Sequence, residues 1–249
     1  MSGVLMQEMT WPEIRDALAR GKTSVVLAVA SVEQHGPALP LNTDEEIGRA
    51  LAVEVARCLG DALVGPVVVP GCSEHHMAWP GTISLPAEVL VSLIIHYVKS
   101  LSRHGFREII LFAAHGGNFG PLAARLEDIR RAARPARVID LLDAQSLFGA
   151  WFEVLRDFGR ADRTLPHADV METSLMMYLR PELVREGRLE VGFTGTFDLE
   201  ELTRRGLQSF TRNGVLGDPR GASPALGRAL IERVGRKMAD EIRRRREQS

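Results

Sequence analysis

The sequence predicts an α/β fold in which helices flank a mostly parallel central sheet. Three short apolar runs, at residues 24–30, 107–114 and 136–142, are rich in β-branched or aliphatic residues, which is typical of strands buried on both faces. Stretches with helical periodicity lie between these runs. Metal-competent side chains follow the first two runs directly, and in open α/β sheets ligands bind where the strands end. We therefore expect a functional site at the carboxyl edge of the sheet.

The first predicted helix carries signals at both of its ends. Thr10 suits the N-cap, Pro12 suits the first turn, and Glu13 lies three residues after the cap, as in a capping box. Gly21 ends this helix, because glycine adopts the backbone conformation that terminates helices without steric cost.

The remaining elements are predicted from the periodicity and length of their apolar runs and from the proline and glycine residues that end them. We expect a brief strand between the prolines at residues 66–70. Residues 188–221 show no clear period, so we expect an excursion or an oligomer contact there. The helix within 145–164 is rich in aromatic residues, which favours packing on the core or on a neighbouring subunit. The expected helices cover residues 44–59, 86–101, 121–133, 145–164, 166–180 and 224–246.

The composition is that of an ordinary globular protein. The chain has 249 residues, of which 45% are hydrophobic and 25% charged, and we expect a single domain over residues 1–249. A formal net charge of −1 gives no electrostatic reason to expect nucleic acid or a membrane as partner. Because we see no signal segment and no apolar run of bilayer length, we expect a cytoplasmic protein. Cys58 and Cys72 are expected to be reduced and buried.

The first candidate site residues follow the strand predicted at 24–30. Glu33 and His35 are two apart, so their side chains point the same way if the extended conformation continues. Glycine and proline within residues 36–40 turn the chain, which allows Asp44 to come back toward them. Two carboxylates and an imidazole suit zinc, manganese or ferrous iron. Taken alone, a Glu-x-His pair in a loop is more often a solvated surface pair.

A histidine also follows the second apolar run. His115 precedes two glycines and Asn118, and the glycines let the backbone turn tightly into the next helix. A dinucleotide or phosphate loop is the rival interpretation, but one glycine pair lacks the spacing of either motif. The loop at residues 71–82 holds two adjacent histidines, His75 and His76. Adjacent side chains point in different directions, so we expect at most one of them to face the site.

His167 and Glu172 stand at the start of a stretch rich in methionine and leucine, which we interpret as core. The two residues are five apart, an offset that does not stack side chains on a helix. They share a site only if His167 belongs to the loop before the helix.

Read together, these motifs resemble the creatininase (creatinine amidohydrolase) superfamily, from about Trp11 to the closing helix. Several separated motifs in the same order make the resemblance specific. The motifs are Glu-Gln-His-Gly-Pro at 33–37, Asp44, Pro-Gly-Thr at 80–82, His-Gly-Gly-Asn at 115–118, His167, and Glu-Thr-Ser at 172–174.

The resemblance implies a layered α/β fold, two divalent metal ions per chain (Zn, Mn or Fe) and a homohexamer built as a trimer of dimers. It implies that Glu33 and His115 hold one metal, that His35 holds the other, and that Asp44 bridges both. The implied reaction is attack by a metal-bridged hydroxide on a non-peptide C–N bond of a small molecule, a cyclic amide or formamide. His167 matches the histidine that relays protons.

The chain departs from creatininase itself at two places. Members resembling that enzyme have a glutamate that binds the second metal where this chain has Gly117, and Glu172 is our candidate to replace it as a ligand in the catalytic centre. The tryptophans that clamp creatinine are replaced near Leu142 and Arg163, so creatinine is not the expected substrate. We expect substrate contacts from Ser73, His76, Gly117 and Asn118.

Two alternatives stay open at this point. A small metallopeptidase that trims a short peptide would need a deeper and longer groove beside His167. An inactive metal-binding oligomer would explain the missing carboxylate at Gly117. The convergence of five polar groups argues against the second alternative, since burying them costs free energy.

Overall fold

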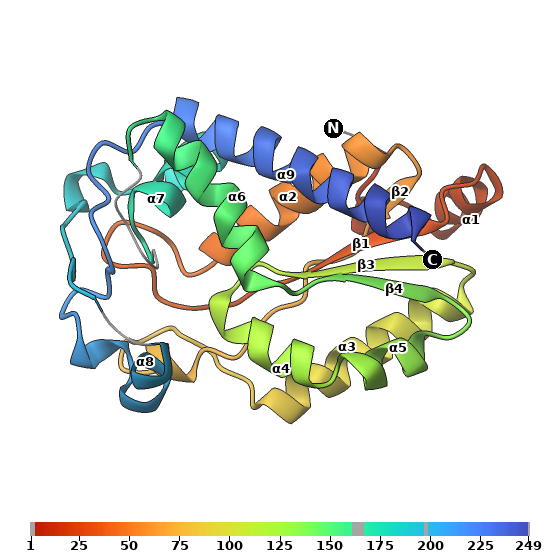
Figure 1. Ribbon diagram of the computed structural model, residues 1–249, viewed down its shortest axis with the longest axis horizontal. Helices are drawn as coiled ribbons and strands as arrows, with labels where there is room; N and C mark the ends of the chain where they lie inside the picture. Colours follow the sequence, from red (N-terminus) through yellow and green to blue (C-terminus); the bar gives the residue numbers. More distant parts are fainter. Residues whose placement is uncertain (1–2, 161–166, 197–198, 249) are drawn as a thin grey trace.

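The computed structural model describes residues 3–160, 167–196 and 199–248. Its centre is a parallel sheet in the order β2-β1-β3-β4 (Figure 1). The strands are β1 (Ser24–Val29), β2 (Ala62–Val64), β3 (Glu108–Ala113) and β4 (Arg137–Leu141). The predicted α/β class and the three main strands are confirmed.

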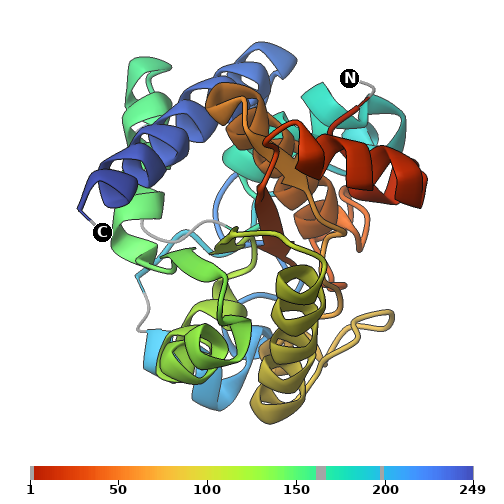
Figure 2. The ribbon, with the colours of Figure 1, turned by 90° about the vertical axis from the view of Figure 1, so that its right-hand side faces the viewer.

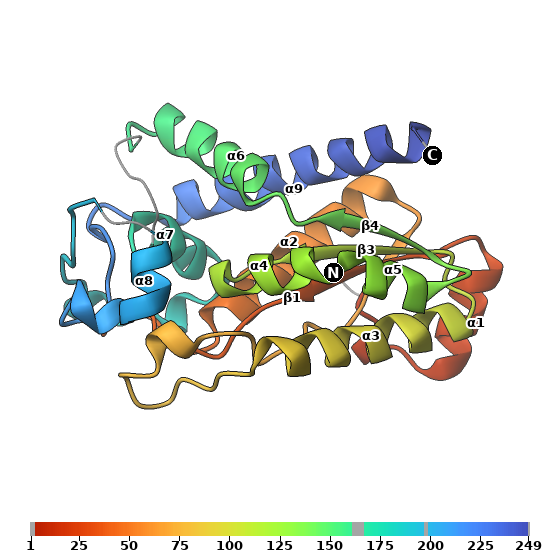
Figure 3. The same cartoon turned by 60° about the horizontal axis from the view of Figure 1, so that its bottom comes forward.

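Helices cover both faces of this sheet, as the views in Figures 2 and 3 show. Alternate strand residues, such as Val26, Ala28 and Phe112, pack toward the helices on one face. Their neighbours, such as Leu27 and Leu111, pack toward the other face. The first face carries α2 (Thr43–Leu59), α6 (Ala144–Asp157), α7 (Val170–Leu179) and α9 (Pro224–Glu247). The second carries α1 (Trp11–Ala19), α3 (Ala87–Arg103), α4 (Phe119–Ala124) and α5 (Leu126–Ala133).

The capping signals at the first helix are confirmed. The backbone N–H of Thr10 donates to the Glu13 carboxylate at 2.6 Å, and the Thr10 hydroxyl donates to the same oxygen at 2.7 Å. These bonds satisfy groups that a helix start leaves unpaired.

The strand predicted at 66–70 and the helix predicted at 121–133 are wrong in position or continuity. The brief strand expected at residues 66–70 lies earlier, at Ala62–Val64, and Val68 makes only an isolated bridge to Val29. The flanking prolines lack the N–H groups that a longer ladder needs. The single helix expected at 121–133 is two helices, because the backbone of Arg125, with φ −119° and ψ 19°, leaves the helical region.

The helix expected from residue 166 begins later, at Val170. Asp169 caps it by accepting a hydrogen bond from the backbone N–H of Met171 at 2.8 Å. His167 therefore precedes the helix, as the shared site with Glu172 requires, whereas Pro166 lies outside the residues that the structure describes.

Within 188–221, the described residues form a short helix, α8 (Leu199–Arg205), and irregular segments, one of which pairs with His167. The backbone N–H of Leu216 donates to the His167 carbonyl oxygen at 2.9 Å, and the His167 N–H donates back at 3.2 Å. Part of the expected excursion, at Leu216, therefore pairs with the backbone of His167.

Two smaller expectations concern cysteine and membranes. Cys58 and Cys72 are free thiols, but each is partly exposed and not buried as expected. Within the described ranges, no helix is both long and apolar enough to cross a membrane.

Candidate metal centre

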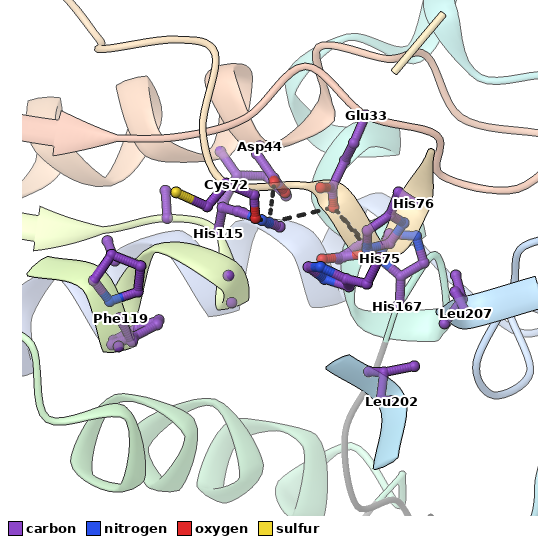
Figure 4. A pocket seen from close by; sticks show the side chains of 18 of the residues that line it. Glu33, Asp44, Cys72, His75, His76, His115, Phe119, His167, Leu202 and Leu207 are labelled. Atoms are coloured by element: carbon purple, nitrogen blue, oxygen red, sulfur yellow. Dashed lines mark hydrogen bonds and ion pairs between the residues drawn. The ribbon is translucent and has the colours of Figure 1, made fainter. Parts of the chain in front are cut away.

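Asp44 belongs to a buried cluster of carboxylates and histidines at the carboxyl edge of the sheet (Figure 4). It lies in the first turn of α2, and its two carboxylate oxygens face different imidazoles. Oδ1 is 3.2 Å from Nε2 of His35, and Oδ2 is 3.2 Å from Nδ1 of His115. The hydroxyl of Ser31, two residues after the end of β1, donates to Oδ2 at 2.7 Å. One carboxylate therefore joins two separate groups of side chains.

The first group contains Glu33, Asp44 and His115. Glu33 Oε1 is 3.3 Å from Nδ1 of His115. The other ring nitrogen of His115, Nε2, donates to the Cys72 carbonyl oxygen at 3.0 Å, since a carbonyl can only accept. Nδ1 is therefore the ring nitrogen that faces the two carboxylates, which is the usual orientation of a metal-binding histidine.

The second group contains His35, Asp44 and Glu172. Nδ1 of His35 donates to the backbone carbonyl oxygen of Glu33 at 3.1 Å, so Nε2 is the ring nitrogen that faces the carboxylates. Glu172 Oε2 lies 3.7 Å from His35 Nε2. The Ala168 N–H donates to Glu172 Oε2 at 2.5 Å, which fixes this carboxylate at the start of α7.

The charges of this cluster fit cations between the carboxylates. Burial alone would raise the pKa of Glu33, but His115 and His76 hold it well below its usual value. Burial raises the pKa of Glu172 to about 8. No described residue hydrogen-bonds Glu33 Oε2, although this oxygen is buried. Buried, unpartnered anionic oxygens cost free energy, and a divalent cation held by imidazole and carboxylate ligands would offset that cost.

His167 lies beside the cluster, and its Nε2 contacts Gln34 twice. Nε2 is 2.9 Å from the Gln34 backbone carbonyl oxygen and 2.9 Å from the Gln34 side-chain amide nitrogen. The tautomer that donates to the carbonyl has an unprotonated Nδ1, which lies 3.9 Å from Glu33 Oε1. Burial, together with the nearby His35, lowers the pKa of His167 to about 3. The imidazole of His167 is therefore neutral in the metal-free chain.

Gln34 and Ser31 are site residues that sequence reasoning missed. The Gln34 side-chain amide donates to the Gly214 carbonyl oxygen at 3.1 Å and to Nδ1 of His76 at 2.9 Å, and its Oε1 accepts from the Gly36 N–H at 2.9 Å. Gln34 therefore links the loop that carries Glu33 and His35 to His76. Their place in the sequence, directly beside Glu33, could have pointed to both residues. They were passed over because neither side chain is charged.

A cavity of about 860 Å³ opens on this cluster. Its polar end contains the carboxylates and histidines, whereas its walls are largely apolar. The walls include Ile47, Leu51, Phe119, Leu147, Phe148, Trp151, Met171, Leu175, Leu202, Leu207 and Leu216.

Residues 7–242 match the family model Creatininase, described as creatinine amidohydrolase. The chain belongs to the creatininase family. It is accordingly a hydrolase that acts on amide bonds, and its polar cluster lies where the motifs predicted the metal centre.

Known creatininase-family proteins resemble this chain over most of its length. Mycofactocin precursor peptide peptidase of Mycolicibacterium smegmatis is 33% identical over 231 residues, which cover 88% of this chain and 84% of that protein. Creatinine amidohydrolase of Pseudomonas putida is 28% identical, with 96% of each chain covered. A solved structure described as "Creatininase Mn" has a TM-score of 0.77 at 26% identity and covers 98% of this chain and 99% of that chain.

Gly117 has no room for the side chain that creatininase-like members carry there. A Cβ at this position would lie 2.1 Å from the Cys72 carbonyl oxygen and 2.6 Å from His115 Nε2. The close approach of the Cys72 backbone, which orients His115, therefore excludes a carboxylate at residue 117.

The predicted substrate contacts divide into two groups. His76 and Gly117 line the cavity. The Ser73 hydroxyl lies 3.3 Å from His115 Nε2 and does not line the cavity, so the predicted contact of Ser73 with substrate is corrected. Asn118 is corrected too, because its Oδ1 accepts from the Cys72 N–H at 2.9 Å and its Nδ2 donates to the Ala30 carbonyl oxygen at 3.0 Å.

The expectation that only one of the adjacent histidines faces the site is wrong. His75 and His76 both line the cavity, because the 3-10 turn Glu74–His76 brings their rings together at 4.3 Å between centroids. His75 also stacks on His115, with the centroids 5.7 Å apart and the planes 13° apart. Burial lowers the pKa of His75 to about 4.

Proposed function

We propose that this creatininase-family hydrolase uses two divalent metal ions, Zn, Mn or Fe. Glu33 and His115 would hold one ion, His35 and Glu172 would hold the other, and Asp44 would bridge them. One observation carries the proposal: the two oxygens of Asp44 each lie 3.2 Å from a different imidazole nitrogen. Each imidazole is oriented by a backbone carbonyl, which supports a ligand role for both.

Bound divalent cations act as Lewis acids and lower the pKa of a coordinated water to about 7. The side chains around them move the protons. His167 accepts the proton of the attacking water at Nδ1, as the water oxygen bonds to the carbonyl carbon. The C–N bond then breaks, and the same nitrogen of His167 delivers the proton to the leaving nitrogen. His76 accepts from the Gln34 amide at Nδ1, so its proton lies on Nε2, which is 3.5 Å from Glu33 Oε1 and can donate a hydrogen bond to the substrate.

The scissile bond is a C–N amide bond. The size of the cavity limits how large the amide substrate can be. A cyclic amide or a formamide is the simplest substrate for the proposed chemistry. A cavity of about 860 Å³ also accommodates a longer substrate, such as a short peptide tail. The relative named as a peptidase, at 33% identity, supports this second candidate. Hydrolysis assays on formamides, cyclic amides and short peptides, followed by mass spectrometry, distinguish the two.

Metal content per chain tests the binuclear centre. For protein purified without chelator, we expect close to two ions per chain by inductively coupled plasma mass spectrometry. Asp44→Ala should release both ions, because the bridging carboxylate serves each. Glu45→Gln removes a neighbouring charge on the same turn of α2 that pairs with Arg49, and it should leave the content unchanged. Wild-type metal content in Asp44→Ala would contradict the bridge, and one or no ion in the wild type would favour an inactive metal-binding protein.

We further propose that the active unit is a homohexamer, a trimer of dimers. This proposal rests on the family resemblance. Sedimentation velocity of the metal-loaded protein tests it, and a monomer at micromolar concentration would overturn it.

A further inference from the structure

One wall of the cavity has no role in the proton transfers. It consists of Phe119 from α4 and of Leu147, Phe148 and Trp151 from α6. Residues 147, 148 and 151 share one side of α6, because positions three and four apart face the same way on a helix. We call this wall the aromatic corner. Figure 4 shows Phe119 on one side of the histidine and carboxylate cluster.

The aromatic corner is held in place from behind. The rings of Phe119 and Phe148 lie 6.2 Å apart between centroids, at 38°. Phe152, which does not line the cavity, stacks on Phe148 with the centroids 6.5 Å apart and the planes at 29°. Trp151 is only 5% exposed. The corner therefore presents a preformed surface, and binding to it would order few side chains.

The opposite apolar wall differs in what it can offer to a ligand. Leu202, Leu207 and Leu216 are nearly fully buried in a cluster of their own with aromatic residues. Phe119, Leu147 and Phe148 keep part of their surface exposed. Apolar surface that is still hydrated in the free protein is the surface from which a ligand gains affinity.

We propose that the aromatic corner binds a bulky apolar or aromatic group attached to the scissile amide. The substrate class is thus an amide with a hydrophobic substituent of about the size of a phenyl ring, not a small polar amide. This inference rests on the proposed metal centre, which places the amide at the polar end of the same cavity. Aromatic pairs that meet edge to face or offset add to the area effect.

Hydroxamates test the corner and the metal centre separately. Acetohydroxamate and phenylacetohydroxamate share a chelating head and differ by one phenyl ring. By isothermal titration calorimetry on the zinc-loaded protein, we expect the phenyl compound to bind at least about tenfold more tightly. Phe148→Ala should remove most of this difference and leave acetohydroxamate affinity unchanged. Phe158→Ala, which truncates an exposed ring at the end of the same helix, should preserve the difference.

The possible results separate the two proposals. Equal affinities for the two hydroxamates would overturn the aromatic corner while supporting the metal centre. No acetohydroxamate binding would count against the metal centre, and phenylacetamide binding by ligand-observed NMR would then decide on the corner. Binding that Phe148→Ala weakens would support it, and no binding would overturn it. If Phe148→Ala does not fold by circular dichroism, Phe119→Ala takes its place.

Discussion

Gly117→Ala should weaken metal binding although it changes no metal ligand. The added Cβ would lie 2.1 Å from the Cys72 carbonyl oxygen and 2.6 Å from His115 Nε2, which are the two partners of one hydrogen bond. Neither approach is sterically possible, so the carbonyl and the imidazole must move apart. The His115 ring then loses the bond that directs its Nδ1 toward Glu33 and Asp44.

The size of the effect follows from that lost bond. Removing the hydrogen-bond partner of a metal-binding histidine lowers metal affinity by about 10- to 100-fold. This corresponds to about 1.4 to 2.7 kcal/mol of binding free energy. The loss of the same bond should lower the free energy of unfolding by about 1 kcal/mol.

A zinc titration against a fluorescent chelator measures the affinity, and urea denaturation measures the stability. Gly116→Ala is the matched control, because a Cβ at residue 116 meets nothing within 4 Å. If Gly117→Ala binds zinc as tightly as Gly116→Ala does, the proposed orientation of His115 by the Cys72 carbonyl is refuted.

Three further predictions concern proton transfer, the second metal and pH. His167→Ala should keep its metal and lose about 10²- to 10⁴-fold in kcat, because an acid–base group of this kind contributes that much; unchanged turnover would remove His167 from the reaction. Glu172→Gln should lower the occupancy of one metal and spare the other, and mass spectrometry showing two retained ions would make Glu172 a bystander. Burial alone would raise the pKa of Glu108, but hydrogen bonds from Arg246 and Arg137 lower it below its usual value. Glu108 therefore contributes stability above its unfolded pKa of about 4.5, which is lost as pH falls through the lower folded pKa. Urea denaturation between pH 7 and 3 should show a shallower loss in Glu108→Gln, and identical slopes would exclude this contribution.

The sequence predicted the parts of this protein that depend on local interactions. Strands β1 and β3 were found because continuous apolar runs of that length are buried on both faces of a parallel sheet. The capping box of Thr10 could be predicted because both of its residues lie within one helical turn of each other. Residues 66–70 and the break at Arg125 were misjudged, since pairing with β1 and packing against α3 involve distant chain segments.

The same division holds in the candidate site. Glu33, His35 and Asp44 were identified because they lie close together in sequence, and the motifs added His115, His167 and Glu172. The sequence by itself therefore pointed to the charged and imidazole side chains of the cluster, but not to Ser31 or Gln34. It could not show that Ser73 and Asn118 lie behind the site, because their partners are more than ten residues away. Ser73 bonds the Ser84 hydroxyl and the His115 ring, and Asn118 bonds the backbones of Cys72 and Ala30.

Only the tertiary structure decided how these side chains are oriented. The split of Asp44 between two imidazoles depends on β1 and β3 lying side by side, which brings His35 and His115 to opposite oxygens. The crowding at Gly117 depends on the path of the Cys72 backbone. Orientation and crowding are set by distances between segments far apart in the chain, and such distances exist only once the sheet has formed.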